Sequence, residues 1–350
     1  MFAMDRRDFG KLLAFGGLAA VSPAIGAQTT VRPGHRSVIK PAKLKAGDTV
    51  GMVAPASMAF EADAITMAKE QVEALGFKVR LGEHVFDKHG YFAGTDESRA
   101  GDINRMFADD SIDAIFFYTG GWGTPRLLPL LDYALIRRNP KVILGYSDIT
   151  ALLNGIHQET GLITFHGPVA ASNMQAWSVD NLKRTLMSSD PIGVLSNPPK
   201  DTDALVERTF RLITIRGGSA SGRLVGGNLT LLSVMMGTPW EIDTEGAILL
   251  LEDTHEKLYR VDRMITQLRL GGKLKQAAGI VFGYCTDCPV EGPSFSLEEI
   301  LRDHMEPLGI PVLSGLAFGH IRKMLTLPIG LEATLDADAG TLTIDESAVV

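Results

Sequence analysis

The sequence predicts an α/β protein of two domains, the first of them built on a parallel sheet. From about residue 41 to 170, short apolar runs alternate with helical patterns, which is typical of a parallel sheet with helices on both faces. A second unit with its own strands and helices begins near residue 219. The chain has 350 residues, 45% of them hydrophobic, and can bury one large core or two ordinary ones. We therefore expect domains over residues 41–170 and 219–346, with a linker and loops over 171–218.

In the first domain, apolar runs of strand length are separated by longer segments with a helical pattern. The expected strands are, in chain order, Thr49–Val53, Lys78–Arg80, Ile112–Phe117 and Val142–Leu144. Helical patterns cover Ala62–Leu75 and Glu97–Phe107, a further segment covers Arg126–Tyr133, and a helix begins near Asp148. Ligands of open α/β sheets bind beyond the carboxyl ends of the strands, so the residues that follow these strands are candidates for a site.

The pattern weakens over residues 171–218 and resumes in the second domain. Polar, turn-forming stretches such as Ser188–Pro191 favour loops in the weaker region. A helix is expected where Val261, Met264, Ile265 and Leu268 recur at the i, i+3, i+4 and i+7 positions. The other elements expected here are the strand Arg223–Val225, a helix after Asn228, the strands Ala247–Leu251 and Gly279–Phe282, a helix near Leu297–His304 and the strand Thr341–Ile344.

The first 27 residues have the features of an export signal. Arg6 and Arg7 precede an apolar run over residues 12–24, and Ala27 ends a segment suited to cleavage. A twin arginine of this kind resembles a Tat signal. The apolar run is shorter than the roughly 20 residues that a membrane span needs, so no stable membrane insertion is expected. We expect a periplasmic protein, or a cytoplasmic one if this N-terminus is merely disordered and is not a functional signal.

Composition and spacing argue against several partners and cofactors. The formal net charge of −7 does not suit a protein that neutralises phosphates, so nucleic acid is not an expected partner. Cys285 and Cys288 supply at most half of a zinc site, and we expect two free thiols, with a disulfide as the alternative in an oxidising compartment. The glycine-rich segments 119–123 and 226–228 lack the fingerprints of phosphate and dinucleotide loops. We therefore expect no metal and no cofactor.

Ser147 follows the short apolar strand Val142–Gly145 at a helix start, where its hydroxyl would project from the carboxyl end of the sheet. Such a serine becomes a nucleophile when a histidine accepts its proton, and the amide of Asp148 could help to hold an oxyanion. An ordinary helix N-cap is the competing interpretation of Ser147. The segment also departs from the Gly-x-Ser-x-Gly pattern, because Ile149 stands where the second glycine would be.

A nucleophilic serine needs a base and a carboxylate, and the sequence offers more than one of each. Glu252 ends the apolar strand Ala247–Leu251, with Asp253 and Glu256 as rivals, and helix capping is the competing role for the first two. Among eight histidines, His166 follows the apolar segment after the Ser147 helix and His320 lies in Phe318–His320. Spacing alone does not choose between His166 and His320.

Taken together, these segments resemble the LD-carboxypeptidase family of serine peptidases, which includes the peptidases that inactivate microcin C. The resemblance runs from about residue 42 to 346. Its motifs are Gly90–Glu97, Gly120–Gly123, Gly145–Thr150, Thr164–Pro168, Gly226–Leu229, Leu251–Asp253, Tyr259–Met264 and His320 with Thr326–Gly330. Thr119 departs from the family, which commonly has an arginine there, and Thr124-Pro125 is also unusual; we expect these departures to bear on substrate specificity.

The resemblance implies a flavodoxin-like N-terminal domain that carries the nucleophile, a swivelling C-terminal α/β domain, and a homodimer. It implies that Ser147 is the nucleophile, Glu252 the orienting carboxylate and His320 the general base and acid, with His166 structural. The backbone amides of Asp148 and Gly121 would form the oxyanion hole. Asn228 and Tyr259 would line the substrate cleft.

The function that this resemblance implies is release of the terminal D-alanine from a murein tetrapeptide, with the murein peptide as partner. One alternative keeps the chemistry and changes the substrate to an aminoacyl nucleotide amide, for which Trp177 is the candidate stacking residue. Another alternative is a murein-peptide binding protein without turnover.

Overall fold

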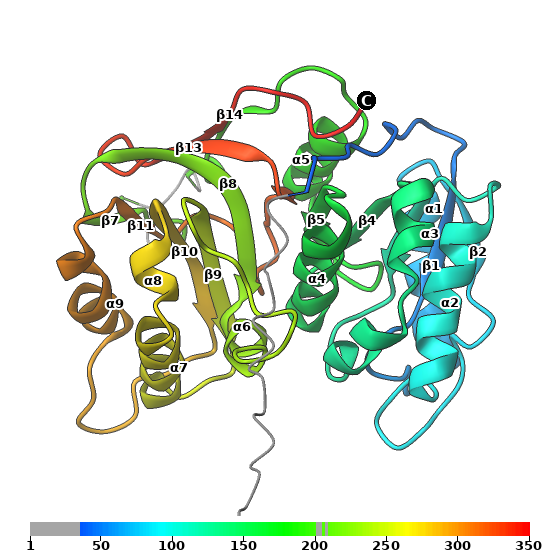
Figure 1. Cartoon of the computed structure of the whole chain (residues 1–350), viewed down its shortest axis with the longest axis horizontal. Coiled ribbons are helices and arrows are strands. Elements are labelled where there is room, and N and C mark those ends of the chain that lie inside the picture. Colours follow the sequence, from blue (N-terminus) through cyan, green and yellow to red (C-terminus); the bar gives the residue numbers. More distant parts are fainter. Residues whose placement is uncertain (1–35, 201–204, 207–208) are drawn as a thin grey trace, which may run out of the picture. The chain divides into compact units, whose positions relative to one another are not determined.

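Two β-sheets organise the fold, one in each half of the chain, with helices packed around them (Figure 1). The computed structural model describes residues 36–200, 205–206 and 209–350, and the expected signal segment lies outside them. The described residues form one compact unit. Both sheets therefore belong to a single packed body. None of the described helices combines the length and the apolar composition that crossing a membrane requires.

The first sheet has six strands in the order β12-β5-β4-β3-β1-β2, and its parallel part has the 2-1-3-4-5 order of flavodoxin-like folds. Its strands are β1 (Thr49–Val53), β2 (Lys78–Leu81), β3 (Ala114–Phe117), β4 (Val142–Gly145), β5 (Thr164–His166) and β12 (Leu327–Ile329). The central strands β3 and β4 are buried along their whole length, as expected where helices cover both faces. The prediction of a flavodoxin-like first domain is confirmed.

Helices cover both faces of this sheet because alternate strand residues point to opposite sides. On β3, Ala114 and Phe116 pack into one core cluster, and Ile115 and Phe117 pack into another. The first cluster receives α1 (Ala62–Ala74) and α5 (Ala176–Leu186), and the second receives α2 (Asp96–Ala108), α3 (Tyr133–Arg138) and α4 (Thr150–Thr160). The segment Arg126–Tyr133 is divided between the 3-10 helix η2 (Thr124–Leu130) and α3, and Pro129 in η2 lacks the N–H that an α-helix would use.

The second sheet has eight strands in the order β6-β14-β13-β8-β9-β10-β11-β7. They are β6 (Gly193–Leu195), β7 (Ile213–Arg216), β8 (Ser219–Asn228), β9 (Ile248–Thr254), β10 (Gly279–Thr286), β11 (Val312–Ser314), β13 (Glu332–Asp336) and β14 (Thr341–Ile344). Strands β8, β9, β10 and β11 pair in parallel, and the outer strands pair antiparallel. One face packs against α6 (Leu229–Val234), α7 (Leu258–Leu270), α8 (Lys273–Gln276) and α9 (Leu297–Met305).

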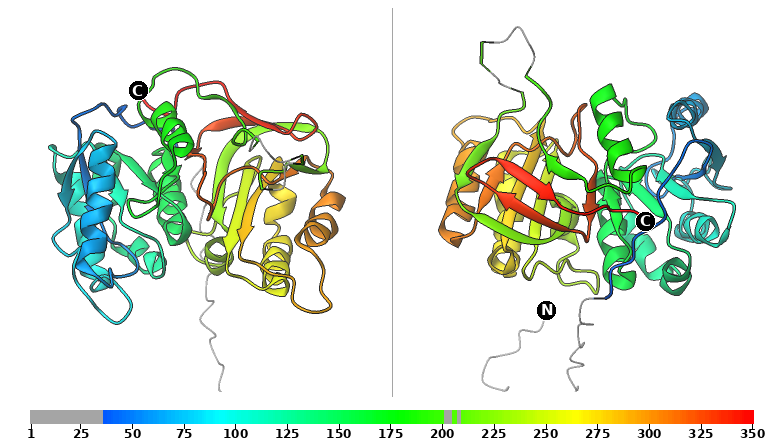
Figure 2. Two further views of the ribbon diagram at one scale, coloured as in Figure 1. Left: turned by 180° about the vertical axis from the view of Figure 1, so that it is seen from behind. Right: turned by 90° about the horizontal axis from the view of Figure 1, so that it is seen from above.

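A continuous core joins the two halves. Leu224, Leu250 and Val281 of the second sheet lie in the same cluster as Phe116 of the first sheet. The chain also returns from the second half to the first, because β12 pairs antiparallel with β5. Val350 then bonds the backbone near residues 41–43, and Figure 2 shows this C-terminal end beside the N-terminal half.

Two expectations about the second half need correction. The segment 171–218 was expected to be a linker and loops, but it contains α5, β6 and β7, and Leu182 and Leu186 of α5 are buried in the shared core. The second expectation was two free thiols at Cys285 and Cys288. The structure joins them in a disulfide at the end of β10, with a Cα–Cα distance of 5.7 Å. That separation is ordinary for a disulfide.

We predict that Gly226→Ala destabilises the protein more than Gly237→Ala does. Both glycines have a positive φ, and an alanine in such a backbone conformation lowers the free energy of unfolding by about 1–2 kcal/mol. At Gly226 the added Cβ would also lie 2.2 Å from the carbonyl oxygen of Leu250 on β9, whereas at Gly237 nothing lies within 4 Å. Overpacking adds about 1–3 kcal/mol at Gly226. Urea denaturation of both variants measures the two losses of unfolding free energy, and equal losses would contradict the prediction.

Candidate active site

Ser147 lies in a left-handed backbone conformation just after β4. Its φ is 65°, which is uncommon for a residue other than glycine and is held only where the surroundings enforce it. The residues that follow form the 3-10 helix η3 (Ser147–Ile149) and then α4. The N-cap positions of these helices are Tyr146 and Ile149, and neither cap uses the Ser147 hydroxyl. The N-cap interpretation of Ser147 is therefore wrong.

Glycines on both sides let the chain pack closely around this turn. A Cβ on Gly145 would lie 2.8 Å from Cγ2 of Ile149, and a Cβ on Gly120 would lie 2.8 Å from Cβ of Ser147. Ile149 thus folds back onto the glycine that ends β4. This contact explains how a tight strand-to-helix turn forms although Ile149 replaces the second glycine of the Gly-x-Ser-x-Gly pattern.

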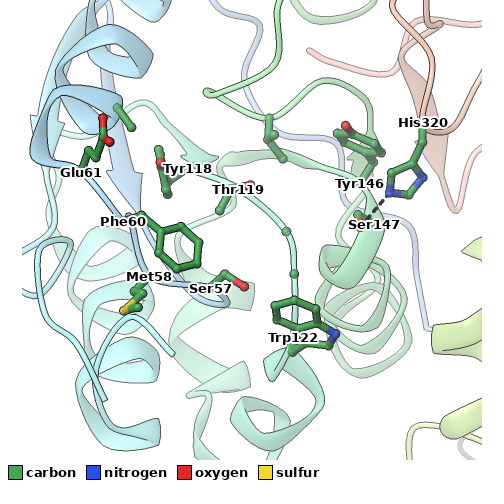
Figure 3. Close-up of a pocket in the computed structure, with 14 residues that line it drawn as sticks. Ser57, Met58, Phe60, Glu61, Tyr118, Thr119, Trp122, Tyr146, Ser147 and His320 are labelled. Atoms are coloured by element: carbon green, nitrogen blue, oxygen red, sulfur yellow. Dashed lines mark hydrogen bonds between the residues drawn. The ribbon is translucent and has the colours of Figure 1, made fainter. Parts of the chain in front are cut away.

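Ser147, His320 and Glu252 form a hydrogen-bonded relay (Figure 3 draws its serine–histidine part). The Oγ of Ser147 lies 2.9 Å from Nε2 of His320, and Nδ1 of His320 lies 2.7 Å from Oε2 of Glu252. Glu252 is on β9 and is fully buried. Gly319 makes room for its carboxylate, because a Cβ there would lie 2.6 Å from Oε2. The three segments singled out in the sequence thus meet at one place.

The rival carboxylates have other partners. Asp253 follows Glu252 on the strand and points to the opposite side, where it accepts hydrogen bonds from Asn228, Thr230 and Thr254. Burial, supported by the nearby charge of Glu252, raises the pKa of Asp253 to about 6. Glu256 lies 3.2 Å from Arg260 in an ion pair. Neither carboxylate bonds His320 in the described part of the chain.

The rival histidine, His166, is fully buried at the end of β5. Neither of its ring nitrogens has a hydrogen-bond partner among the described residues. Burial is the main cause that lowers the pKa of His166 to about 4, so the ring is neutral near pH 7. Its ring packs edge-on against Tyr146 and Phe318. Residue spacing did not choose between His166 and His320 as the base, and the hydrogen bonds to Ser147 and Glu252 favour His320.

The pKa of His320 is raised, and the cause is its carboxylate neighbours. Burial alone lowers this pKa, but the charge of Glu252, its hydrogen bond to the ring and the charge of Asp253 together outweigh burial. Glu252 therefore stabilises the imidazolium that forms when His320 accepts a proton. This is the electrostatic role of the acid in a serine–histidine–acid triad.

The glycine-rich segment 119–123, called the glycine loop below, lies beside Ser147 and is held by buried polar groups. The amide of Thr124 donates to the Asp148 carboxylate at 2.8 Å, and the Thr124 hydroxyl donates to the Asp148 carbonyl oxygen. The loop closes on Ser57, whose Oγ lies only 1.9 Å from where a Cβ on Gly121 would be. A Cβ on Gly120 would lie 2.8 Å from Cβ of Ser147, so the loop runs directly beside the serine. Donation by the amides of Asp148 and Gly121 stays a prediction.

A buried arginine supports this loop, and sequence reasoning did not find it. Arg99 of α2 is 1% exposed, donates to the carbonyl oxygens of Pro55 and Gly123, and pairs with Asp96. Its guanidinium also lies 4.6 Å from the ring centre of Phe92. The chain has Thr119 where an arginine was expected, and Arg99 is the cation that contacts the loop from α2. No local pattern marks an arginine on a helix for this role.

A cavity of about 450 Å³ opens beside the relay (Figure 3). Ser147, His320 and the glycine loop line it, together with the buried or partly buried Tyr118 and Tyr146 and two exposed aromatic residues, Phe60 (78% exposed) and Trp122 (63% exposed). Trp177, the expected stacking residue, instead packs against the core and does not line this cavity. The exposed aromatic surface at the site is therefore that of Phe60 and Trp122.

The two residues expected to line the cleft differ in their surroundings. Asn228 is 3% exposed, its side-chain oxygen caps α6 at the amide of Leu231, and its side-chain nitrogen bonds Asp253. These contacts give it a structural role, and its contact with substrate stays a prediction. Tyr259 is exposed near the start of α7, 5.4 Å from the guanidinium of Arg263, and does not line the cavity beside Ser147.

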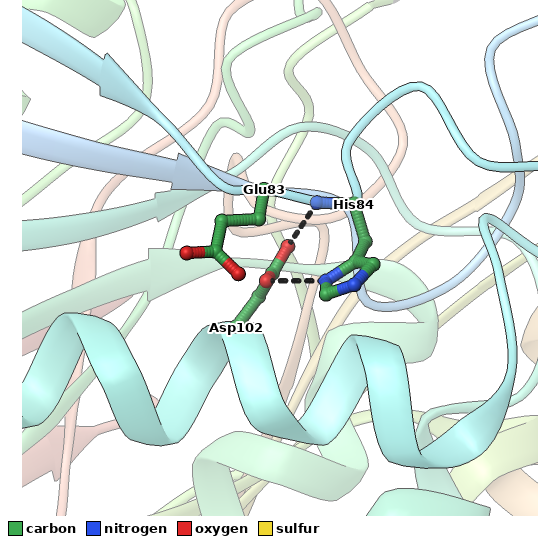
Figure 4. A group of neighbouring side chains, drawn as sticks. All are labelled: Glu83, His84 and Asp102. Carbon is green, nitrogen blue, oxygen red and sulfur yellow. Dashed lines mark hydrogen bonds and ion pairs between the residues drawn. The ribbon is translucent and has the colours of Figure 1, made fainter.

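One cluster of possible metal ligands occurs in the described part of the chain, and it lies outside the cavity beside Ser147. Glu83, His84 and Asp102 place their ligand atoms within 4.8 Å of one another (Figure 4). The guanidinium of Arg105 donates to Asp102 and lies 3.0 Å from Nδ1 of His84. Because a cation already neutralises these groups, the cluster is best described as an ion-pair network.

Comparison with known families identifies both halves of the chain. Residues 50–167 match the LD-carboxypeptidase N-terminal domain, and residues 221–335 match the LD-carboxypeptidase C-terminal domain. Ser147 lies in the first range, and Glu252 and His320 lie in the second.

Individual relatives extend the similarity over nearly the whole chain. A probable murein peptide carboxypeptidase of Bacillus subtilis is 41% identical over 308 residues, which cover 87% of this chain and 94% of the relative. A murein tetrapeptide carboxypeptidase of Pseudomonas aeruginosa is 32% identical over 83% of this chain and 93% of its own. The structure of a microcin C7 self-immunity protein in complex with aspartyl sulfamoyl adenosine has a TM-score of 0.80, with 29% identity, and covers 89% of this chain and 100% of that one.

We predict that Glu252→Gln lowers the pKa of His320 below its ordinary value of about 6.5. In the native protein the pKa of His320 is raised above this ordinary value. Removing the Glu252 charge leaves burial as the dominant influence, and burial disfavours the imidazolium. An NMR titration of the His320 ring measures both values. Glu256→Gln is the matched control and should leave the titration unchanged; an unshifted His320 in Glu252→Gln would contradict the prediction.

Proposed function

This chain belongs to the LD-carboxypeptidase family and is a serine-type peptidase, and we propose that it releases the C-terminal D-alanine of murein tetrapeptides. The observation that carries the proposal is the Ser147–His320–Glu252 relay at the edge of a cavity. The names of the relatives, a murein peptide carboxypeptidase and a murein tetrapeptide carboxypeptidase, support the choice of substrate.

In the proposed mechanism, His320 takes the proton of the Ser147 hydroxyl while Oγ attacks the carbonyl carbon of the scissile amide. The resulting oxyanion accepts hydrogen bonds from the amides of Asp148 and Gly121. His320 then gives its proton to the amide nitrogen as the C–N bond breaks, and D-alanine leaves with a free amine. Water attacks the acyl-enzyme with His320 again as the base, which releases the tripeptide and restores the serine.

Glu252 contributes in two ways that follow from its burial. Its hydrogen bond to Nδ1 fixes the ring so that Nε2 faces Ser147, and its charge stabilises the imidazolium in both halves of the reaction. A fully buried carboxylate cannot gain the same stabilisation from water, so its favourable partner is the ring itself. The histidine thus cycles between two protonation states in a fixed position.

A second candidate, hydrolysis of an aminoacyl nucleotide amide, is favoured by a different observation. A cavity of about 630 Å³ also borders His320, and its lining includes Phe210, Tyr284, Arg322 and Lys323. The two aromatic rings are 6.1 Å apart. Aromatic faces and cations together suit a base and a phosphate. The related self-immunity protein was solved with an aminoacyl sulfamoyl adenosine, which supports this candidate.

We expect the chain from residue 28 onward to release D-alanine from L-Ala-D-Glu-diaminopimelate-D-Ala, and Ser147→Ala to lose at least about 10⁴-fold in kcat. Without Oγ no acyl-enzyme can form. Ser221→Ala, on β8, is the matched control and should keep full activity, and a chelator should have no effect. Full activity in Ser147→Ala would contradict the proposal. An aminoacyl phosphoramidate of adenosine is tested in parallel, and turnover of that compound alone would favour the second candidate.

We also propose that the protein works in the periplasm. The twin arginine at residues 6 and 7 supports export, and the disulfide between Cys285 and Cys288 suits an oxidising compartment. The full chain should therefore be recovered from the periplasmic fraction, and the double variant Arg6→Lys, Arg7→Lys from the cytoplasm. Recovery of the unaltered full chain from the cytoplasm would contradict this proposal.

A further inference from the structure

A third cavity, smaller than the two described above, also borders His320. Its volume is about 310 Å³, at the lower end of the range of small-molecule sites. It shares Tyr146 and His320 with the cavity beside Ser147, but neither Ser147 nor the glycine loop lines it. The two cavities therefore meet at the ring that passes the proton from the serine to the leaving group.

The position of the ring decides which part of a substrate each cavity would hold. The acyl group stays bonded to Ser147, next to the cavity of about 450 Å³ beside that serine. The leaving amine must lie within hydrogen-bond reach of Nε2 of His320 to receive its proton. D-Alanine is small and the murein tripeptide is large, so the sizes of the two cavities agree with this division.

Arg322 brings a fixed positive charge to the smaller cavity. It follows His320 by two residues and belongs to the lining of the cavity. The hydroxyl of the fully buried Ser178 donates to the carbonyl oxygen of Arg322 at 3.3 Å and accepts from the amide of Met324 at 2.9 Å. The backbone that carries Arg322 is thus tied to α5. Across the described ranges, the guanidinium itself has no hydrogen bond or ion pair assigned to it.

Each of the two linings also contains one acidic residue. In the smaller cavity it is Asp287, whose carboxylate lies 3.4 Å from Nε2 of His255. In the cavity beside Ser147 it is Glu61, and His320 is the basic residue there. Among the described residues of the two linings, Arg322 alone carries a permanent positive charge, so a carboxylate on the leaving group would be attracted to it.

We propose that Arg322 binds the terminal carboxylate of the leaving D-alanine and so restricts the enzyme to free C-termini. The inference rests on the proposed carboxypeptidase function. A guanidinium can hold a carboxylate through two parallel N–H···O bonds, which fixes the orientation of the leaving group as well as its position. Its amine would then be presented to Nε2 of His320, and an internal peptide bond would lack the charge that Arg322 recognises.

The test compares the tetrapeptide with the same peptide ending in D-alaninamide, which lacks the negative charge. We expect the native enzyme to prefer the acid, and Arg322→Ala to lose about 10–100-fold in kcat/KM on the acid, because one charge-assisted contact is worth about that much. On the amide, Arg322→Ala should stay within about twofold of the native enzyme. Arg322→Lys should recover part of the preference, since it restores the charge without the fork. Arg269→Ala, an exposed arginine on α7, is the matched control.

The outcomes separate this inference from the proposed function. No D-alanine release by the native enzyme would overturn the proposed function, and the role of Arg322 with it. Release from the acid with an unchanged preference in Arg322→Ala would overturn the role of Arg322 alone. Equal losses on both substrates would also overturn it, because they would indicate a structural role. Labelling of Ser147 by a fluorophosphonate shows in each variant that the relay is still assembled.

Discussion

The buried carboxylate of Glu252 is the constraint on which the rest of the site depends. It is fully buried within β9, and a charge in that position is costly unless a partner compensates for it. His320 is that partner, and the ring can approach only because Gly319 leaves room for the carboxylate. The second ring nitrogen, Nε2, is bonded by Oγ of Ser147, whose left-handed backbone places the hydroxyl toward the ring. Each member of the relay therefore depends on the next.

The relay also depends on the way in which the two halves of the chain are joined. Ser147 follows a strand of the first sheet, and Glu252 lies on a strand of the second, so their meeting requires the two sheets to keep a fixed relation. A shared core, the return of the chain through β12 and the packing of α5 supply that relation. These are the features that sequence reasoning saw least well. A three-residue strand and a helix in a polar context give only a weak periodic signal.

The limits of the sequence follow from which contacts are local. The strand Thr49–Val53 and the strand before Ser147 are visible because an apolar run of strand length is a local property. The roles of His166 and His320 are not local: the ring of His320 meets a serine 173 residues away, and no spacing rule reports such a pairing. The same holds for Arg99, Phe60 and Trp122, which reach the site through packing. Family resemblance found the triad because it carries information on long-range contacts that periodicity lacks.

The cavities that border His320 differ in volume and in charged residues, and this difference bears on the substrates that the site could accept. In the proposed mechanism the relay breaks the acyl bond, and the cavities of about 450 Å³ and 310 Å³ would hold the groups on the two sides of that bond. A cation near the leaving group favours an anion there, and both a terminal carboxylate and a phosphate meet that requirement. Volume then separates the two, since a cavity of about 310 Å³ suits a single amino acid and the neighbouring one of about 630 Å³ could hold a nucleotide. Selectivity can thus change through the walls beyond the histidine while Ser147, His320 and Glu252 stay the same.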